Sequence, residues 1–110
     1  MSSHSYIKNK NNESIVININ GSLYKRDDAK ISVFDSGFLL GDGVWEGIRL
    51  HQSVLVYIEK HLDRLYESAK GISLDIGINK EDIINEINKT LYRNNMKDDV
   101  HIRLIISRGN

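Results

Sequence analysis

The segment over residues 34–49 constrains this chain most, because it places three glycines directly in front of a strand-like run. Gly37, Gly41 and Gly43 permit backbone geometries and close approaches that other residues resist. The run over residues 44–50 alternates and suits a strand. That strand carries the aromatic and charged side chains of Trp45, Glu46 and Arg49. We therefore expect a tight loop feeding a strand, serving either to turn the chain or to form a pocket rim.

Composition excludes several classes of protein. The 110 residues are 40% hydrophobic and 27% charged, which is ordinary for one globular domain with a modest core. Because 15 basic residues balance 15 acidic ones, no field of one sign would steer nucleic acid or an anionic membrane to the chain. The absence of cysteine excludes disulfides and thiolate metal sites and fits a cytoplasmic protein. No apolar run approaches the roughly 20 residues that span a bilayer.

The pattern of apolar residues predicts strands and two helices in one domain over residues 14–110, preceded by a polar, disordered leader over residues 1–13. Alternation or short apolar runs predict strands over residues 14–19, 22–25, 44–50, 53–57 and 100–107. Asn20-Gly21 is a hairpin signal, and a short extended piece is expected over residues 31–33. One amphipathic helix starts near Ile58, with Gly71 as its left-handed cap. A second helix runs from near Asn79 to near Asn94, and Asn79 and Asp82 are spaced like a cap and its third helical residue. These elements together indicate an α+β domain with a partly antiparallel sheet.

Arg64 is a candidate anion-binding residue on the first helix. His61 and Arg64 stand three apart, so they share one helix face that is offset from the apolar stripe. An arginine held there can grip a phosphate through charge-assisted, bidentate hydrogen bonds. The alternative is a solvated helix face with Arg64 near Asp63 and Glu67.

Two pairs of residues on strands are candidates for binding a carboxylate. Trp45 and Arg49 share one face of their strand, and His101 and Arg103 share one face of theirs. If the second face is turned inward, a ligand anion is the natural partner of its arginine; if it is turned outward, it is an ordinary polar face. Ordinary packing with a surface charge is likewise the alternative for the first pair.

Other chemistry has little support in the sequence. Glu46 points away from Trp45, and a salt bridge to a lysine or arginine is the expected role, with a general base as the alternative. The four histidines show no metal-ligand spacing, and no P-loop, nucleophile elbow or HExxH motif is present. Gly41-Asp42-Gly43 is too short for a dinucleotide fingerprint.

Taken together, the motifs resemble the N-terminal part of the fold-type IV, or class IV, pyridoxal-phosphate enzymes, which include branched-chain aminotransferases, D-amino-acid aminotransferases and aminodeoxychorismate lyases. The resemblance covers residues 17–109. Its order and separations are more specific than any one piece: Gly-Asp-Gly-Val-Trp-Glu-Gly-Ile-Arg over residues 41–49, His-Leu-Asp-Arg-Leu over 61–65, Ser-Ala-Lys over 68–70, His-Ile-Arg over 101–103 and Arg-Gly over 108–109.

The resemblance implies a role for particular residues. Arg64 matches the arginine that binds the phosphate of pyridoxal 5'-phosphate. The residues that match the substrate side of the pocket are Leu40, Trp45, Arg49, His101 and Arg103. Leu40 departs from the pattern, since an aromatic is common there, and His101 stands where branched-chain enzymes tend to carry tyrosine. The family pattern also implies a homodimer whose pocket is built partly from both subunits.

We therefore expect the chain to be the N-terminal part of a transaminase that moves an amino group between an amino acid and a 2-oxo acid. The Gly-Ile-Arg motif favours a branched-chain amino acid. Transamination needs a lysine that forms a Schiff base with the cofactor, and this family carries it in a later domain. Lys60 and Lys70 match no such position, so the chain alone is expected to be inactive. Gly-Ile-Arg resembles the branched-chain enzymes, whereas His-Leu-Asp-Arg-Leu-Tyr and Gly-Asp-Gly resemble the D-amino-acid enzymes. A lyase and a non-catalytic binding or interaction module are two further candidates.

Overall fold

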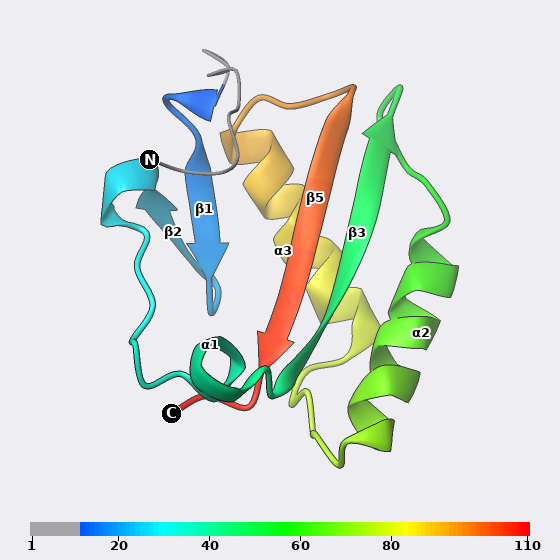
Figure 1. The fold of residues 1–110 in the computed structure, drawn as a ribbon. Coiled ribbons are helices and arrows are strands. Elements are labelled where there is room, and N and C mark those ends of the chain that lie inside the picture. The colour runs from blue at the N-terminus through cyan, green and yellow to red at the C-terminus, as the bar shows by residue number, and fades with distance from the viewer. Residues whose placement is uncertain (1–11) are drawn as a thin grey trace, which may run out of the picture.

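The computed structural model describes residues 12–110, which form the expected α+β domain (Figure 1). Its main sheet has three strands in the order β4-β3-β5, and both strand pairs are antiparallel. β3 spans Gly43–His51, β4 spans Val54–Leu55 and β5 spans Val100–Ser107. Because β4 pairs only with the last two residues of β3, most of that edge of β3 lies beside no other described strand.

Two amphipathic helices cover one face of this sheet (Figure 1). α2 spans Ile58–Gly71 and α3 spans Lys80–Arg93. Every second residue of β3 faces the helices, which places Val44, Ile48 and Leu50 in the core. The core also contains buried residues of the two helices and the connection between them, Leu62, Leu65, Ala69, Leu74, Ile83, Ile87 and Leu91. Asn79 caps α3 as expected, accepting a hydrogen bond from the Asp82 backbone N–H at 2.8 Å.

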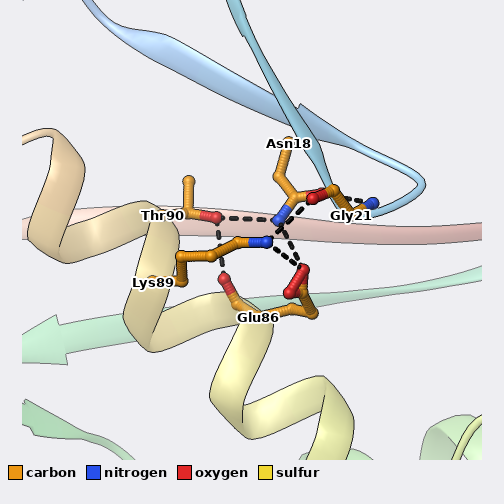
Figure 2. Close-up of polar contacts among 5 residues, drawn as sticks. All are labelled: Asn18, Gly21, Glu86, Lys89 and Thr90. Carbon is orange, nitrogen blue, oxygen red and sulfur yellow. Dashed lines mark hydrogen bonds and ion pairs between the residues drawn. The ribbon is translucent and has the colours of Figure 1, made fainter.

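A separate hairpin of β1, Val16–Ile19, and β2, Ser22–Lys25, packs against α3. Asn20 and Gly21 both have positive φ, which confirms the expected Asn-Gly turn. The Asn18 side chain accepts from the Gly21 N–H at 2.9 Å and donates to Thr90 Oγ1 at 3.1 Å (Figure 2). Lys89 of α3 donates to the Gly21 carbonyl at 2.8 Å (Figure 2). Polar contacts therefore join the hairpin turn to the helix.

The glycine segment is not a simple loop, because it contains the short helix α1, Ser36–Leu40. Asp35 caps it by accepting from the Phe38 N–H at 3.1 Å, and Gly41, with φ 67°, ends it in the left-handed region. Gly43 is required for a different reason: a Cβ there would lie 2.6 Å from the backbone oxygen of Ile106 on β5. The expected tight loop therefore folds as one capped helical segment followed by a close strand approach.

Further expectations need correction or fall outside the described residues. Gly71 is not the left-handed cap of α2; it is the last residue of the helix, and Ser73 adopts the positive φ instead. The expected extended piece over residues 31–33 is not a strand, and residues 26–28 form a 3-10 turn, η2, Arg26–Asp28. The strand expected over residues 53–57 is reduced to β4. The expected leader lies outside the described residues except for its last two. Among residues 12–110, no helix is long and apolar enough to cross a membrane.

Candidate functional site

Four of the candidate residues meet on one exposed face of the main sheet. Trp45 and Arg49 come from β3, and His101 and Arg103 come from β5. The two strands are paired so that Arg49 stands opposite His101 and Gly47 stands opposite Arg103. Since α2 and α3 pack on the other face, these four side chains lie on the side that the helices leave uncovered.

Arg103 and Trp45 interact directly on this face. The central carbon of the Arg103 guanidinium lies 4.6 Å from the centroid of the indole ring. Trp45 is 58% exposed, so the ring is a platform on the surface rather than part of the core. Gly47 lies beside this pair, and a Cβ there would approach His101 Cε1 to 3.0 Å. The missing side chain of Gly47 thus leaves room for the imidazole to lie across β3.

Leu40 does not belong to this group of four. It is the last residue of α1 and is 79% exposed. The structure therefore places it on a different element from the sheet face that carries the other candidates.

The other face of β3 carries a buried carboxylate at Glu46. It follows Trp45 along the strand but points the opposite way, between the core positions of Val44 and Ile48, and is only 5% exposed. Arg64 donates two hydrogen bonds to it, from Nε to Oε2 at 2.9 Å and from Nη2 to Oε1 at 2.7 Å. His61 Nδ1 lies 2.7 Å from Oε1. The expected salt bridge of Glu46 is confirmed, and its partner is Arg64.

The charges of this cluster stabilise one another. The hydrogen bonds from Arg64 hold the pKa of Glu46 below its ordinary value, against burial, which raises it; the contact with His61 also lowers it. In return, Glu46 raises the pKa of the Arg64 guanidinium. Glu46 is thus held as a carboxylate, and Arg64 is fixed to it rather than to its helix neighbours Asp63 and Glu67. Asp63 itself pairs with Lys80 at 2.5 Å.

Arg64 remains accessible although it is paired. Its side chain is 67% exposed, whereas that of Glu46 is 6% exposed. Arg64 lines a shallow pocket of about 280 Å³ together with Tyr57, Lys60 and His61. A guanidinium with N–H donors to spare beside an ammonium group is a donor set that suits phosphate. The arrangement can therefore bind an anion at the first two turns of α2.

Arg108, a member of the terminal Arg-Gly motif, ties the glycine segment to the far end of α2. It donates to Asp42 Oδ2 at 2.6 Å and to the Ile72 carbonyl at 2.6 Å. Beside it, Ser107 donates to Asp35 Oδ1 at 2.6 Å. These contacts, together with the Glu46–His61 contact, were not predicted, because they join residues far apart in sequence. The alternation of Glu46 with Val44, Ile48 and Leu50 is the signal that could have placed it on the helix-facing side.

Within the described part of the chain, no group of three or more His, Cys, Asp or Glu side chains could hold a metal ion. The candidate residues form two groups, which are associated with opposite faces of β3. One is the pocket that Arg64 lines on α2. The other is the aromatic and cationic face around Trp45 and Arg103.

Comparisons with known proteins find a matching family and several relatives of this chain. The family model described as amino-transferase class IV matches residues 43–110. The putative branched-chain-amino-acid aminotransferase of Methanocaldococcus jannaschii is 47% identical over 93 residues, which are 84% of this chain and 32% of that protein. The D-alanine aminotransferase of Listeria monocytogenes is 35% identical over 91 residues, which are 83% of this chain and 31% of that protein.

A solved structure has a fold similar to that of this chain. The branched-chain amino acid aminotransferase of T.th. with pyridoxamine 5'-phosphate matches with a TM-score of 0.75 and 27% identity, over 84% of this chain and 32% of that chain. This chain thus spans about a third of the length of these three proteins.

Proposed function

The chain belongs to the amino-transferase class IV family, and from this premise we propose that it is the N-terminal part of a pyridoxal 5'-phosphate-dependent transaminase. The reaction moves an amino group between a branched-chain amino acid and a 2-oxo acid. The M. jannaschii relative and the Gly-Ile-Arg motif over residues 47–49 support the branched-chain assignment. The observation that carries the proposal is the exposed guanidinium of Arg64, held by Glu46 in a pocket that also contains Lys60.

The residues of the Arg64 pocket suit the cofactor's phosphate, and pyridoxamine 5'-phosphate is present in the similar T.th. structure. We assign phosphate binding to Arg64. When bound, pyridoxal phosphate supplies the carbonyl that accepts the amino group and the ring that withdraws electrons from the substrate. The residues of this chain bind and orient the cofactor, while the lysine that the chemistry requires is expected elsewhere in the complete protein.

We assign the substrate side of the pocket to the opposite face of β3. Trp45 offers an apolar surface for an aliphatic side chain, and Arg49 and Arg103 offer cations for a carboxylate. His101 stands opposite Arg49 on the paired strand, and Leu40 lies at the end of α1. Because β4 pairs only with the last two residues of β3, most of this strand edge, which separates the two faces, lies beside no other described strand.

We further propose a cytoplasmic homodimer. Large apolar side chains are exposed over the segment before and within α1: Ile31, Val33, Phe34, Phe38, Leu39 and Leu40. A surface of this kind favours coverage by another part of the protein or by a second subunit. The absence of cysteine suits a reducing compartment. The mass of the complete protein in solution, measured by light scattering, tests the dimer.

The function is tested on the complete protein that contains residues 1–110. We expect amino transfer from L-leucine and L-valine to 2-oxoglutarate, and little from D-alanine. A preference for D-alanine would establish the second candidate, a D-amino-acid aminotransferase, which the L. monocytogenes relative favours. Residues 1–110 alone are expected to give no turnover. Cofactor binding without turnover by the complete protein would establish a non-catalytic binding module instead.

A further inference from the structure

We propose that Glu46 is the positioning residue that directs the guanidinium of Arg64 toward the cofactor's phosphate. The inference rests on the function proposed above and concerns the same site. It assigns to Glu46 an effect on phosphate binding without contact to the phosphate.

The hydrogen bonds between the two side chains fix the guanidinium along one edge. Arg64 uses Nε and Nη2 for Glu46, at 2.9 and 2.7 Å. The N–H groups of Nη1 are on the remaining side of this planar group. Because Glu46 is almost fully buried, whereas Arg64 is mostly exposed and lines the pocket, the side of the guanidinium turned away from Glu46 is the side left for an anion. An anion arriving in the pocket thus meets donors whose orientation is already fixed.

His61 holds the carboxylate itself in place. Its Nδ1 lies 2.7 Å from Oε1, the oxygen that also accepts from Arg64 Nη2 at 2.7 Å. With contacts to both oxygens, Glu46 has little freedom to rotate. The carboxylate stands on a strand, and β3 is paired with β5 along its length. Arg64 is therefore positioned from the rigid sheet, although its own side chain is long and otherwise mobile.

The position of Glu46 in the core supports a directing role. Its neighbours on the same face, Val44, Ile48 and Leu50, are buried apolar residues. A carboxylate among them loses hydration, and such a pair is in general no more stabilising than apolar residues of similar volume. What the carboxylate contributes beyond packing is the direction of Arg64. The charge of Glu46 also neutralises that of Arg64, so Lys60 in the same pocket supplies positive charge for the phosphate.

The test compares pyridoxal 5'-phosphate with pyridoxal, which lacks only the phosphate, as ligands of the complete protein. Equilibrium dissociation constants are measured for the wild type, Glu46→Gln, Arg64→Met and the double variant. Glu67→Gln is the matched control, because it removes an exposed carboxylate from the same helix, α2, that carries Arg64. We expect Glu46→Gln to weaken binding of the phosphorylated ligand about tenfold and to leave pyridoxal binding unchanged. The double variant is expected to bind pyridoxal 5'-phosphate no more weakly than Arg64→Met does, because Glu46 acts through Arg64.

Thermal midpoints of all variants show whether they fold. If Glu46→Gln does not fold, Glu46→Asp replaces it, since it keeps the charge but withdraws the carboxylate by one methylene. If Glu46→Gln loses affinity equally for both ligands, or for neither, the positioning role is overturned. The proposed function is upheld in that case if Arg64→Met still weakens binding of the phosphorylated ligand. If the wild type binds neither ligand, or binds both equally and Arg64→Met changes nothing, the proposed function falls and the inference falls with it.

Discussion

The guanidinium of Arg103 lies over the indole ring of Trp45, with its central carbon 4.6 Å from the ring centroid. The two residues belong to adjacent antiparallel strands and lie on the face of the sheet that α2 and α3 leave uncovered. The contact is of the cation–π type, which at exposed positions contributes about 0.5–1 kcal/mol. Trp45 thereby limits the directions in which Arg103 can point.

The first prediction concerns substrate binding. Arg103→Met in the complete protein is expected to raise the KM for the amino acid about tenfold or more, because a charge-assisted hydrogen bond to the carboxylate is lost. The affinity for pyridoxal phosphate is expected to stay unchanged, since Arg64 belongs to α2 and pairs with Glu46 on the other face of β3. Steady-state kinetics and cofactor titration measure the two quantities. Arg93→Met, at the exposed end of α3, is the control, and an equal effect there would contradict the prediction.

The second prediction concerns stability and pH. Arg64→Met leaves the buried Glu46 with only His61, and we expect a lower free energy of unfolding at pH 7, because a buried carboxylate loses two hydrogen bonds. Because the folded-state pKa of Glu46 lies below 4.5, the contribution of its pairing is fully present above that pH. It is lost as the pH falls through the lowered pKa and Glu46 becomes protonated.

Urea unfolding at pH 7, 5 and 4, and at lower pH while the protein stays folded, tests the second prediction. The difference between wild type and Arg64→Met is expected to be largest at pH 7 and to shrink toward the acidic end. Lys70→Met, an exposed change in the last turn of the same helix, serves as the control. A difference that stays constant at every pH would mean that the pair with Glu46 is not its source.

The sequence predicted best those features that depend only on residues within one strand or helix. The bounds of β5 over residues 100–107 and its two faces followed from alternation alone. Asn79 as the cap of α3 followed from local hydrogen bonding, because its side chain satisfies a backbone donor three residues later. Such features depend on neighbours in sequence, and a single chain therefore contains the information that predicts them.

The errors have a common physical origin. The glycine segment was expected to turn as a loop, yet Asp35 and Gly41 cap a helix of five residues within it. Gly71 was expected to cap α2 in the left-handed region, but it is the last helical residue and Ser73 has the left-handed φ, with its carbonyl accepting from Arg108. Contacts with the C-terminal end of the chain accompany both differences, since Ser107 donates to Asp35 and Arg108 donates to the Ser73 carbonyl. Such distant contacts help to decide between conformations that the local sequence permits.

The third prediction tests the cap of α3. Asn79→Ala removes the acceptor of the Asp82 N–H and is expected to cost about 1 kcal/mol in the free energy of unfolding. Asn79→Asp keeps an acceptor and adds negative charge at the positive end of the helix, so its cost is expected to be close to zero. Urea unfolding followed by circular dichroism measures both. Equal losses in the two variants would show that the side-chain hydrogen bond is not what stabilises this helix.

The last prediction compares two glycines whose surroundings differ. A Cβ at Gly43 would lie 2.6 Å from the Ile106 backbone oxygen, which cannot move without disturbing the pairing of β3 with β5. We expect Gly43→Ala to cost about 2 kcal/mol or more in the free energy of unfolding, because strand backbone must shift. Gly71 has open space around it and lies in α2 without a positive φ.

Gly71→Ala is therefore expected to be neutral or to stabilise the protein by about 0.4–1 kcal/mol, since alanine restricts the unfolded chain and suits a helix. Urea unfolding of the two variants beside the wild type gives the comparison. The same substitution thus has opposite expected effects at two positions, which removes differences in residue chemistry from the test. A stable Gly43→Ala variant would mean that the close approach of β3 to β5 relaxes at little cost, and a destabilised Gly71→Ala variant would mean that the end of α2 requires glycine.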